Sequence, residues 1–331
     1  GAVVYVPAVR ADLAGDLARL RSRGAEAVVI DLEDSVPVDE RASLVSHVAD
    51  ALRGLDPQRC PPAIFLRPAD AEALRGLHAL TPPAAAHVTG VVLPKVSRAN
   101  VANLFRGVRS LERAWQRRLL SMPVLEAPEI AHVRSRVAEL EAVRGEMVRS
   151  DVSIAAVRIG ATDLGSAFGV RRDGRHTVYD IAAIAAVIGD VVSTFAPRGD
   201  PAVPIAGPVW EHFRPRGTGF GRTGMDVLID EILRDRANGL VGKTVIHPSH
   251  IGIVHALHAV EQHDYADAVE IVAAGPGGVS RARGLDRMNE YSPHRAWAQR
   301  TLRRARAFGV LAAGVDYTDV VDVVDVMGAG A

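Results

Sequence analysis

The chain has 331 residues, 48% of them hydrophobic, and equal numbers of acidic and basic side chains give it a formal net charge of zero. This length is enough for one large α/β domain and an appendage, and the charge balance argues against nucleic acid as a partner. We find neither an apolar run of about 18 residues nor a signal-peptide pattern, and the one cysteine, Cys60, fits a reducing compartment, so we expect a cytoplasmic protein without a membrane span.

Short apolar runs rich in valine and isoleucine recur along the chain. They are continuous rather than alternating, which is typical of parallel strands that are covered on both faces. The expected strands are Val3–Val6, Ala27–Leu32, Ala63–Leu66, Gly90–Leu93, Ser121–Leu125, Ala155–Ile159, Val203–Ala206 and Lys243–Ile246.

Amphipathic stretches separate these runs, with apolar residues at a spacing of three to four, as in helices that cover a core. The expected helices are Asp12–Ser22, Asp39–Arg53, Asp70–Leu80, Arg98–Arg118, Pro128–Val143, Tyr179–Phe195 and Met225–Asn238, with another after His247. Eight strand and helix units predict a (β/α)₈ TIM barrel, which we assign to residues 1–262. The alternative is a doubly wound sheet, but the turn after the first strand, Pro7–Ala11 (PAVRA), lacks the glycines of a dinucleotide fingerprint.

Residues 263–331 are expected to form a mostly helical C-terminal extension. Asp264–Ala274 and His294–Phe308 have helical patterns, and the glycine-rich segment Gly275–Gly284 between them is expected to be a hinge. The last segment, Tyr317–Met327, alternates acidic residues with valine. This extension could be a small cap or an arm that packs on a neighbouring subunit.

Charged and polar side chains directly follow the expected strands. In a TIM barrel the active site lies at the carboxyl ends of the strands, and a charge that abuts a buried run needs a partner. We therefore interpret the set as a site, with a purely structural network of ion pairs as the alternative. The strand ends carry Asp31, Glu33, Asp34, Arg67, Lys95, Glu126, Asp163, Glu211, His212 and His247.

Two of these carboxylates, Glu126 and Asp163, come from neighbouring strands and have no histidine or cysteine beside them. Such a pair suits Mg²⁺ or Mn²⁺, completed by water and substrate oxygens, better than it suits zinc. Glu33 and Asp34 could hold metal-bound waters, and the guanidinium of Arg67 could clamp a carboxylate or an enolate oxygen. The residues therefore predict a site for Lewis-acid stabilisation of an enolate.

Six motifs, in order along most of the chain, resemble those of the citrate lyase β-subunit-like group within the HpcH/HpaI aldolase family. Each lies at an expected strand end, and their order makes the resemblance specific. The motifs are Val28–Pro37 (VVIDLEDSVP), Phe65–Arg67 (FLR), Val92–Lys95 (VLPK), Pro123–Glu126 (PVLE), Gly160–Leu164 (GATDL) and Gly242–Pro248 (GKTVIHP).

The resemblance implies a Mg²⁺-dependent carbon–carbon lyase or aldolase that acts on a β-hydroxy acid or its coenzyme A thioester. It implies that Glu126 and Asp163 bind the metal, that Glu33 and Asp34 hold its water shell, and that Arg67 orients the keto acid or enolate. It also implies a homo-oligomer, a trimer or hexamer, in which C-terminal segments cross between subunits.

The chain departs from the family pattern at two places. Thioester-using relatives carry a C-terminal Met-Ile-Asp motif whose acid reaches a neighbouring active site; the nearest match here ends in Glu290, which becomes a candidate base alongside a metal-bound water. The turn Pro208–Phe213 (PVWEHF) differs from the usual seventh-strand end. We place Pro208 and His212, with Lys95, among the substrate-binding residues. Coenzyme A use stays open.

Two other functions also remain open. The same scaffold and metal would serve a thioester hydrolase or a phosphoenolpyruvate-type enzyme. A non-catalytic binding subunit is the third alternative, and the complete acidic and arginine set argues against it, because a scaffold has no need of these residues.

Overall fold

The computed structural model describes residues 1–56, 61–196, 203–213, 224–282 and 286–321. Cys60 and the end of the segment Tyr317–Met327 lie outside them. The chain divides into two compact units, Ala2–Ile251 and Gly252–Ala331, the latter together with Gly1. The domain boundary after residue 262 stays a prediction.

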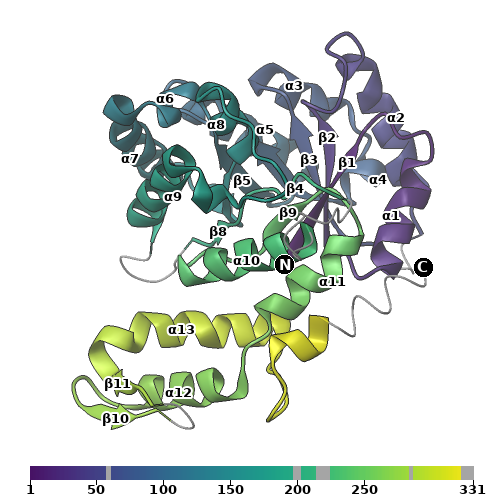
Figure 1. Ribbon diagram of the computed structural model, residues 1–331. Coiled ribbons are helices and arrows are strands. Elements are labelled where there is room, and N and C mark those ends of the chain that lie inside the picture. The colour runs from purple at the N-terminus through teal and green to yellow at the C-terminus, as the bar shows by residue number, and fades with distance from the viewer. Residues whose placement is uncertain (57–60, 197–202, 214–223, 283–285, 322–331) are drawn as a thin grey trace. The chain divides into compact units, whose positions relative to one another are not determined.

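The first unit is a parallel β-barrel with helices around it (Figure 1). Its strands pair in the order β8-β7-β5-β4-β3-β2-β1-β9, and β6 also pairs with β5. A parallel bridge between Gly207 and Lys243 joins the two ends of this order. The strands are β1 (Ala2–Pro7), β2 (Ala27–Leu32), β3 (Ala63–Pro68), β4 (Val88–Leu93), β5 (Leu120–Leu125), β6 (Ser153–Ile154), β7 (Val157–Ile159), β8 (Ile205–Ala206) and β9 (Lys243–Val245). The predicted TIM barrel is confirmed.

The helices follow the strands much as their periodicity predicts. Asp12 and Asp70 cap the first and third, where their side chains accept hydrogen bonds from free backbone N–H groups. The expected helix Pro128–Val143 is split, because His132 has extended backbone angles. The helices are α1 (Leu13–Ser22), α2 (Arg41–Arg53), α3 (Ala71–Gly76), α4 (Pro82–Ala85), α5 (Val101–Trp115), α6 (Pro128–Ala131), α7 (Val133–Arg149), α8 (Ala161–Ala167), α9 (Ala182–Phe195), α10 (Gly224–Ala237) and α11 (Ser249–His258).

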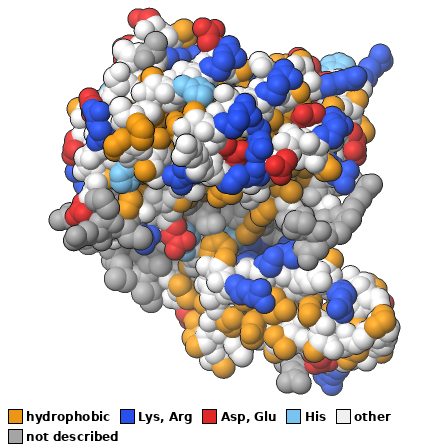
Figure 2. All heavy atoms as spheres, turned by 180° about the vertical axis from the view of Figure 1, so that it is seen from behind, with side chains coloured by type: hydrophobic (Ala, Val, Ile, Leu, Met, Phe, Trp, Pro, Cys, Tyr) orange, Lys and Arg blue, Asp and Glu red, His pale blue; other side chains and the backbone are white. Residues whose placement is uncertain are grey.

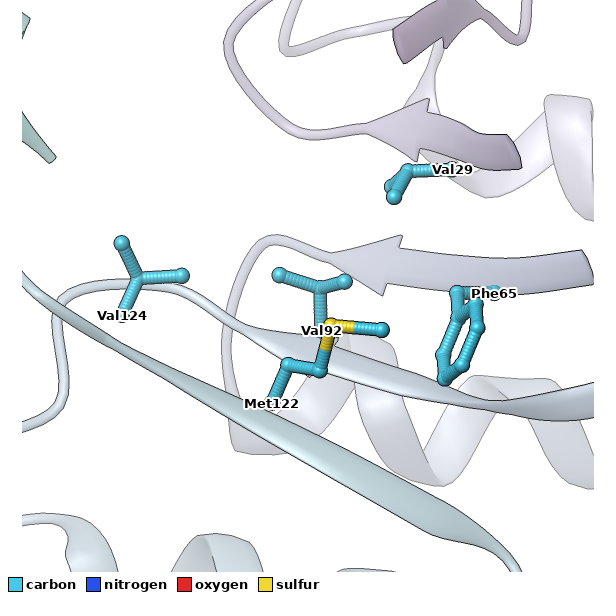
Figure 3. Packing of buried hydrophobic residues seen from close by; sticks show 5 residues of the cluster. All are labelled: Val29, Phe65, Val92, Met122 and Val124. Atoms are coloured by element: carbon cyan, nitrogen blue, oxygen red, sulfur yellow. The ribbon is translucent and has the colours of Figure 1, made fainter. Parts of the chain in front are cut away.

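The interior of the barrel is apolar below the site. A buried cluster is formed by Val29, Phe65, Val92, Met122 and Val124 (Figure 3). Successive residues of a strand point to opposite faces, so the residue two positions further on faces the same way. Beyond Val29, Phe65 and Val124 these next inward positions are Asp31, Arg67 and Glu126. Because side chains alternate along each strand, these three charged side chains point into the mouth of the barrel.

The second unit is mainly helical. It contains α12 (Gln262–Ala273) and α13 (Tyr291–Phe308), which pack through Ala268, Ile271 and Ala298. The segment that we expected to be a hinge differs, because part of it forms β10 (Val279–Arg281), which pairs antiparallel with β11 (Met288–Glu290). Two glycines with positive φ, Gly277 and Gly278, precede this hairpin and supply the turn into it.

Acidic and basic side chains lie among one another on the face of the barrel unit that Figure 2 shows, as the net charge of zero suggests. Within the described part of the chain, no helix combines the length and the apolar character that a membrane crossing requires.

Candidate active site

A pocket of about 560 Å³ lies at the carboxyl ends of the barrel strands. Its wall combines apolar strand residues with acidic and basic side chains, which is the usual make-up of a small-molecule site. The residues that line it are Tyr5, Pro7, Asp31, Asp34, Ser35, Arg67, Val124, Glu126, Arg158, Ile159, Gly160, Thr162, Asp163, Arg171, Val209, Glu211, Thr244 and Ile246. The pocket therefore lies where a TIM barrel is expected to bind its substrate.

Arg67, at the end of β3, is surrounded by carboxylates. Its Nη2 lies 2.5 Å from Glu33 Oε2, 2.9 Å from Asp34 Oδ2 and 3.7 Å from Glu126 Oε1. Its Nη1 lies 3.5 Å from both side-chain oxygens of Asp31. Arg67 is only 7% exposed, so these four acids compensate a charge that water scarcely reaches.

Lys95 follows β4 and contacts the same acids from another side. Its ammonium pairs with Glu33, lies 3.2 Å from Asp34 Oδ1 and lies 3.6 Å from Asp163 Oδ1. Although partial burial disfavours the charged form, the hydrogen bond to Glu33 and the charge of Asp163 hold the pKa of Lys95 above its ordinary value. Lys95 is therefore a permanent cation in this network.

Glu126, at the end of β5, points to the place where β7 ends. A Cβ atom on Gly160 would lie 1.8 Å from Glu126 Oε2, so glycine at this position leaves room for the carboxylate. The backbone nitrogen of Gly160 donates to Leu125 O at 3.4 Å, which keeps the two strand ends side by side. The helix α8 begins directly after this glycine, and Asp163 lies in its first turn.

The charges of this cluster are unbalanced. Five carboxylates, those of Asp31, Glu33, Asp34, Glu126 and Asp163, share two cations, Arg67 and Lys95. Burial, reinforced by the charge of Asp163, raises the pKa of Glu126 to about 7. A further cation beside Glu126 would favour the ionised carboxylate.

The donor set fits a hard divalent cation. Among the described residues no three His, Cys, Asp or Glu side chains form a ready metal cage. Mg²⁺ is commonly held by one or two carboxylates and completed by water and substrate oxygens. The pair of Glu126 and Asp163 meets this requirement, whereas zinc would call for more nitrogen or sulfur ligands.

The structure brings together six of the residues predicted for the site: Glu33, Asp34, Arg67, Lys95, Glu126 and Asp163. The three predicted substrate-binding residues Lys95, Pro208 and His212 are not among the residues that line the pocket. The His212 ring packs edge-on against Trp210 with 5.3 Å between centroids. Glu290 belongs to the second unit, where its backbone nitrogen donates to His294 Nδ1 at 3.0 Å. The roles of all the predicted site residues stay predictions.

The polar pocket residues that were missed in the sequence include Tyr5, Arg158, Arg171 and Thr244. Tyr5 and Arg158 lie inside apolar strand runs, and Thr244 lies inside the motif GKTVIHP. Arg158 could have been found, because it is the one charged residue in the apolar run Ala155–Ile159. A charge that is buried in such a run requires a partner or a ligand. The guanidinium carbons of Arg67 and Arg158 lie 5.7 Å and 5.6 Å from the centroid of the Tyr5 ring.

The match to known families agrees with this geometry. A family model described as a C–C bond lyase of the TIM-barrel fold matches residues 1–310. The chain belongs to this family. The lyase class and the resemblance predicted from the motifs are thereby confirmed.

The relatives of this carbon–carbon bond lyase family member are distant. It is 25% identical over 292 residues to an L-malyl-CoA/β-methylmalyl-CoA lyase of Cereibacter sphaeroides, covering 80% of this chain and 82% of the relative. It is 27% identical over 299 residues to a citrate lyase subunit β-like protein of Deinococcus radiodurans. This match covers 85% of this chain and 88% of the relative.

Two solved structures share the fold of the chain. A citrate lyase of Burkholderia xenovorans has a TM-score of 0.69 at 17% identity and covers 96% of this chain and 95% of its own. The CitE protein of Mycobacterium tuberculosis, in complex with magnesium, acetoacetate and coenzyme A, has a TM-score of 0.59 at 21% identity and covers 92% and 97%.

Proposed function

We propose that the protein is a Mg²⁺-dependent carbon–carbon lyase or aldolase that acts on a β-hydroxy acid or its coenzyme A thioester through an enolate. The observation that carries the proposal is the position of Glu126, a buried carboxyl beside Asp163 in an acid-rich pocket. The family of the chain and the magnesium in the complex of the Mycobacterium tuberculosis protein support it.

Glu126 and Asp163 would hold Mg²⁺, and Glu33 and Asp34 would bind the waters around it. Mn²⁺ suits the same ligands. When bound, the ion would act as a Lewis acid that stabilises negative charge on the enolate oxygen. Arg67 adds a fixed positive charge on the other side of Glu126, from which it lies 3.7 Å away.

The cleavage is a retro-aldol step. A base removes the proton of the β-hydroxyl group, and the electron pair of that O–H bond forms a carbonyl group. The carbon–carbon bond breaks, and its electron pair passes to the carbon beside the carboxyl or thioester group as an enolate, which is then protonated at carbon. The candidate bases are Glu290 of the partner subunit and a water held by Glu33 and Asp34.

The remaining parts of the proposal concern substrate and assembly. Lys95, Pro208 and His212 would contact the substrate, a small carboxylate or its thioester. The protein would act in the cytoplasm as a trimer or hexamer, with the C-terminal region of one subunit packing on the next. Analytical ultracentrifugation tests the assembly, and a monomer at micromolar concentration would remove Glu290 from the candidate bases.

Calorimetric titration with Mg²⁺ tests the metal site. We expect Glu126→Gln and Asp163→Asn to weaken Mg²⁺ binding about 100-fold or more, because each removes one charged ligand. Glu129→Gln is a matched control, since Glu129 is an exposed acid three residues beyond Glu126, and it should bind Mg²⁺ as the wild type does. Unchanged affinity in Glu126→Gln would overturn the proposal.

Analysis of the products by mass spectrometry separates the alternatives on the same scaffold. A lyase splits the carbon skeleton into two carbonyl fragments. A thioester hydrolase releases the thiol and leaves the acid intact, and a phosphoenolpyruvate-type enzyme changes the phosphate content. A binding subunit gives no product at all.

A further inference from the structure

Arg158 is a buried guanidinium without a carboxylate partner among the described residues. It lies on β7 and is 2% exposed. It donates a hydrogen bond to the hydroxyl of Thr244, and its Nη1 lies 3.6 Å from Met122 Sδ. Neither neighbour carries a charge, and arginine keeps its proton in proteins. A buried charge is costly unless an opposite charge meets it.

Arg158 lines the pocket, so a negatively charged ligand bound there could supply the missing opposite charge. Arg158 pairs in register with Val124 on β5. Glu126 directly follows β5 and lies two residues beyond Val124, or about 6.6 Å along the chain. The guanidinium of Arg158 lies over the ring of Tyr5. Arg158 therefore supplies positive charge to the floor of the pocket, while the acidic cluster occupies the rim.

Arg67 differs from Arg158 in having acidic partners within the chain. Its two terminal nitrogens already contact four carboxylates, with the shortest distance 2.5 Å to Glu33 Oε2. These acids compensate its charge before any substrate binds. Arg158 contacts no acid in the described part of the chain, and its planar fork matches a carboxylate.

We propose that Arg158 binds the free carboxylate of the substrate. Thr244 is then a positioning residue that holds the guanidinium in place. The carboxylate then lies at the floor of the pocket, beside Arg158. The oxygen on the neighbouring carbon faces Glu126 and Asp163. The ligand class is a short acid with a keto or hydroxyl oxygen beside its carboxylate. This inference rests on the proposed function, because that function supplies the metal side of the pocket.

Calorimetry with two probes tests the inference. Pyruvate carries a carboxylate, and methyl pyruvate has the same keto group without the charge. In the presence of Mg²⁺ the wild type should bind pyruvate more tightly than the ester. We expect Arg158→Met to weaken pyruvate binding about 30-fold and to lose the preference over the ester, since a charge-assisted pair is removed. Arg158→Lys keeps the charge and should retain the preference.

Arg136→Met is the matched control for removing a buried arginine. Arg136 is also buried, but it pairs with Asp190 at 2.8 Å and donates to two backbone carbonyl groups, those of Ile130 and Ala131. Its loss should lower the melting temperature by several degrees, because buried groups are left unpaired. Arg158→Met leaves no acid unpaired and should melt, without ligand, no lower than the wild type.

The outcomes separate the two proposals. The inference on Arg158 is overturned if Arg158→Met binds pyruvate as tightly as the wild type does. It is also overturned if the wild type does not distinguish pyruvate from its ester. In either case, Mg²⁺ binding that depends on Glu126 leaves the proposed function standing. A wild type that binds no Mg²⁺ instead removes the proposed function.

Discussion

The backbone nitrogen of Lys95 donates a hydrogen bond of 3.0 Å to Glu126 Oε1. Lys95 adopts a left-handed conformation with φ of 50°, which is uncommon for a residue with a side chain, and Asn100 Nδ2 supports it through a 2.9 Å hydrogen bond to its carbonyl oxygen. The ammonium of the same residue lies 3.6 Å from Asp163. Lys95 thus contacts both proposed metal ligands, one through its backbone and the other through its side chain.

The side-chain charge of Lys95 should oppose a metal ion while it helps the substrate. We expect Lys95→Gln to tighten Mg²⁺ binding about threefold to tenfold, since a positive charge close to Asp163 is removed. Turnover should fall about tenfold or more, because the proposed contact between Lys95 and the substrate is removed. Arg98→Gln, an exposed cation three residues away, should change neither value. Weaker Mg²⁺ binding in Lys95→Gln would contradict this account.

The space that Gly160 leaves for Glu126 can be filled by one methyl group. In Gly160→Ala the new Cβ would collide with Glu126 Oε2, at 1.8 Å in the present geometry. We expect Mg²⁺ affinity to fall at least about tenfold while the far-ultraviolet circular dichroism stays that of the wild type. In the control Gly189→Ala the new methyl group meets no atom within 4 Å on α9, and Mg²⁺ binding should be unchanged. Equal affinities in the two variants would show that Glu126 does not hold the ion.

Lys243 belongs to the motif GKTVIHP, and the structure gives it a structural role. Its ammonium lies 2.8 Å from Glu231 Oε1 and 2.7 Å from Asp235 Oδ2, and all three side chains are fully or almost fully buried. Lys243→Met leaves two buried acids without this partner, so we expect a loss of about 3–5 kcal/mol in the free energy of unfolding, measured with urea.

The control for Lys243 is an ion pair on the surface. Arg149 pairs with Glu146 on α7 at 2.9 Å and is 69% exposed. Arg149→Ala should cost less than about 1 kcal/mol, because solvent screens the pair. If Lys243→Met costs no more than Arg149→Ala, the buried network does not stabilise the barrel.

His250 should make the stability of the barrel depend on pH. It is 1% exposed, and burial, with smaller contributions from the charges of His247 and Lys243, lowers its pKa from 6.5 to about 4. Between these two values the unfolded chain binds one more proton than the folded one, so stability falls as the pH falls from about 6.5 to 4, by up to about 3 kcal/mol. In His250→Phe the slope of the unfolding free energy against pH in this range should decrease by the equivalent of nearly one bound proton. A slope that is the same in both proteins would refute the assignment.

Much of the barrel could be predicted because its signals are local. The run Ala27–Leu32 forms β2 with the expected bounds, and Glu126 was placed correctly because a charge ends the apolar run of β5. Parallel strands share one edge, so charges that end successive runs meet in one mouth. By contrast, α8 has seven residues, too few for a helical period to appear, and Asp163 was expected on a strand-end loop.

Other features depend on contacts between distant segments. The sixth strand is broken into β6 and β7, and β7 pairs with the upper part of β5. Because of this break, the side chain of Arg158 faces the pocket. The alternation of side chains along an unbroken strand Ala155–Ile159 does not predict that orientation. The hairpin of β10 and β11 was missed for a similar reason, since its strands have three residues each and gain order from pairing with one another.

We could predict from the amino-acid sequence the order of strands and helices, the barrel class and the residue types at the mouth, because these follow from hydrophobic periods and from the charges that end each run. The pairing of those charges could not be predicted and follows from the way the strands pack together. Arg67 is taken up by four carboxylates, whereas Arg158 meets none among the described residues. The physical reason is that distances between side chains on different strands depend on how the barrel closes and how its strands are staggered, and no single strand carries that information.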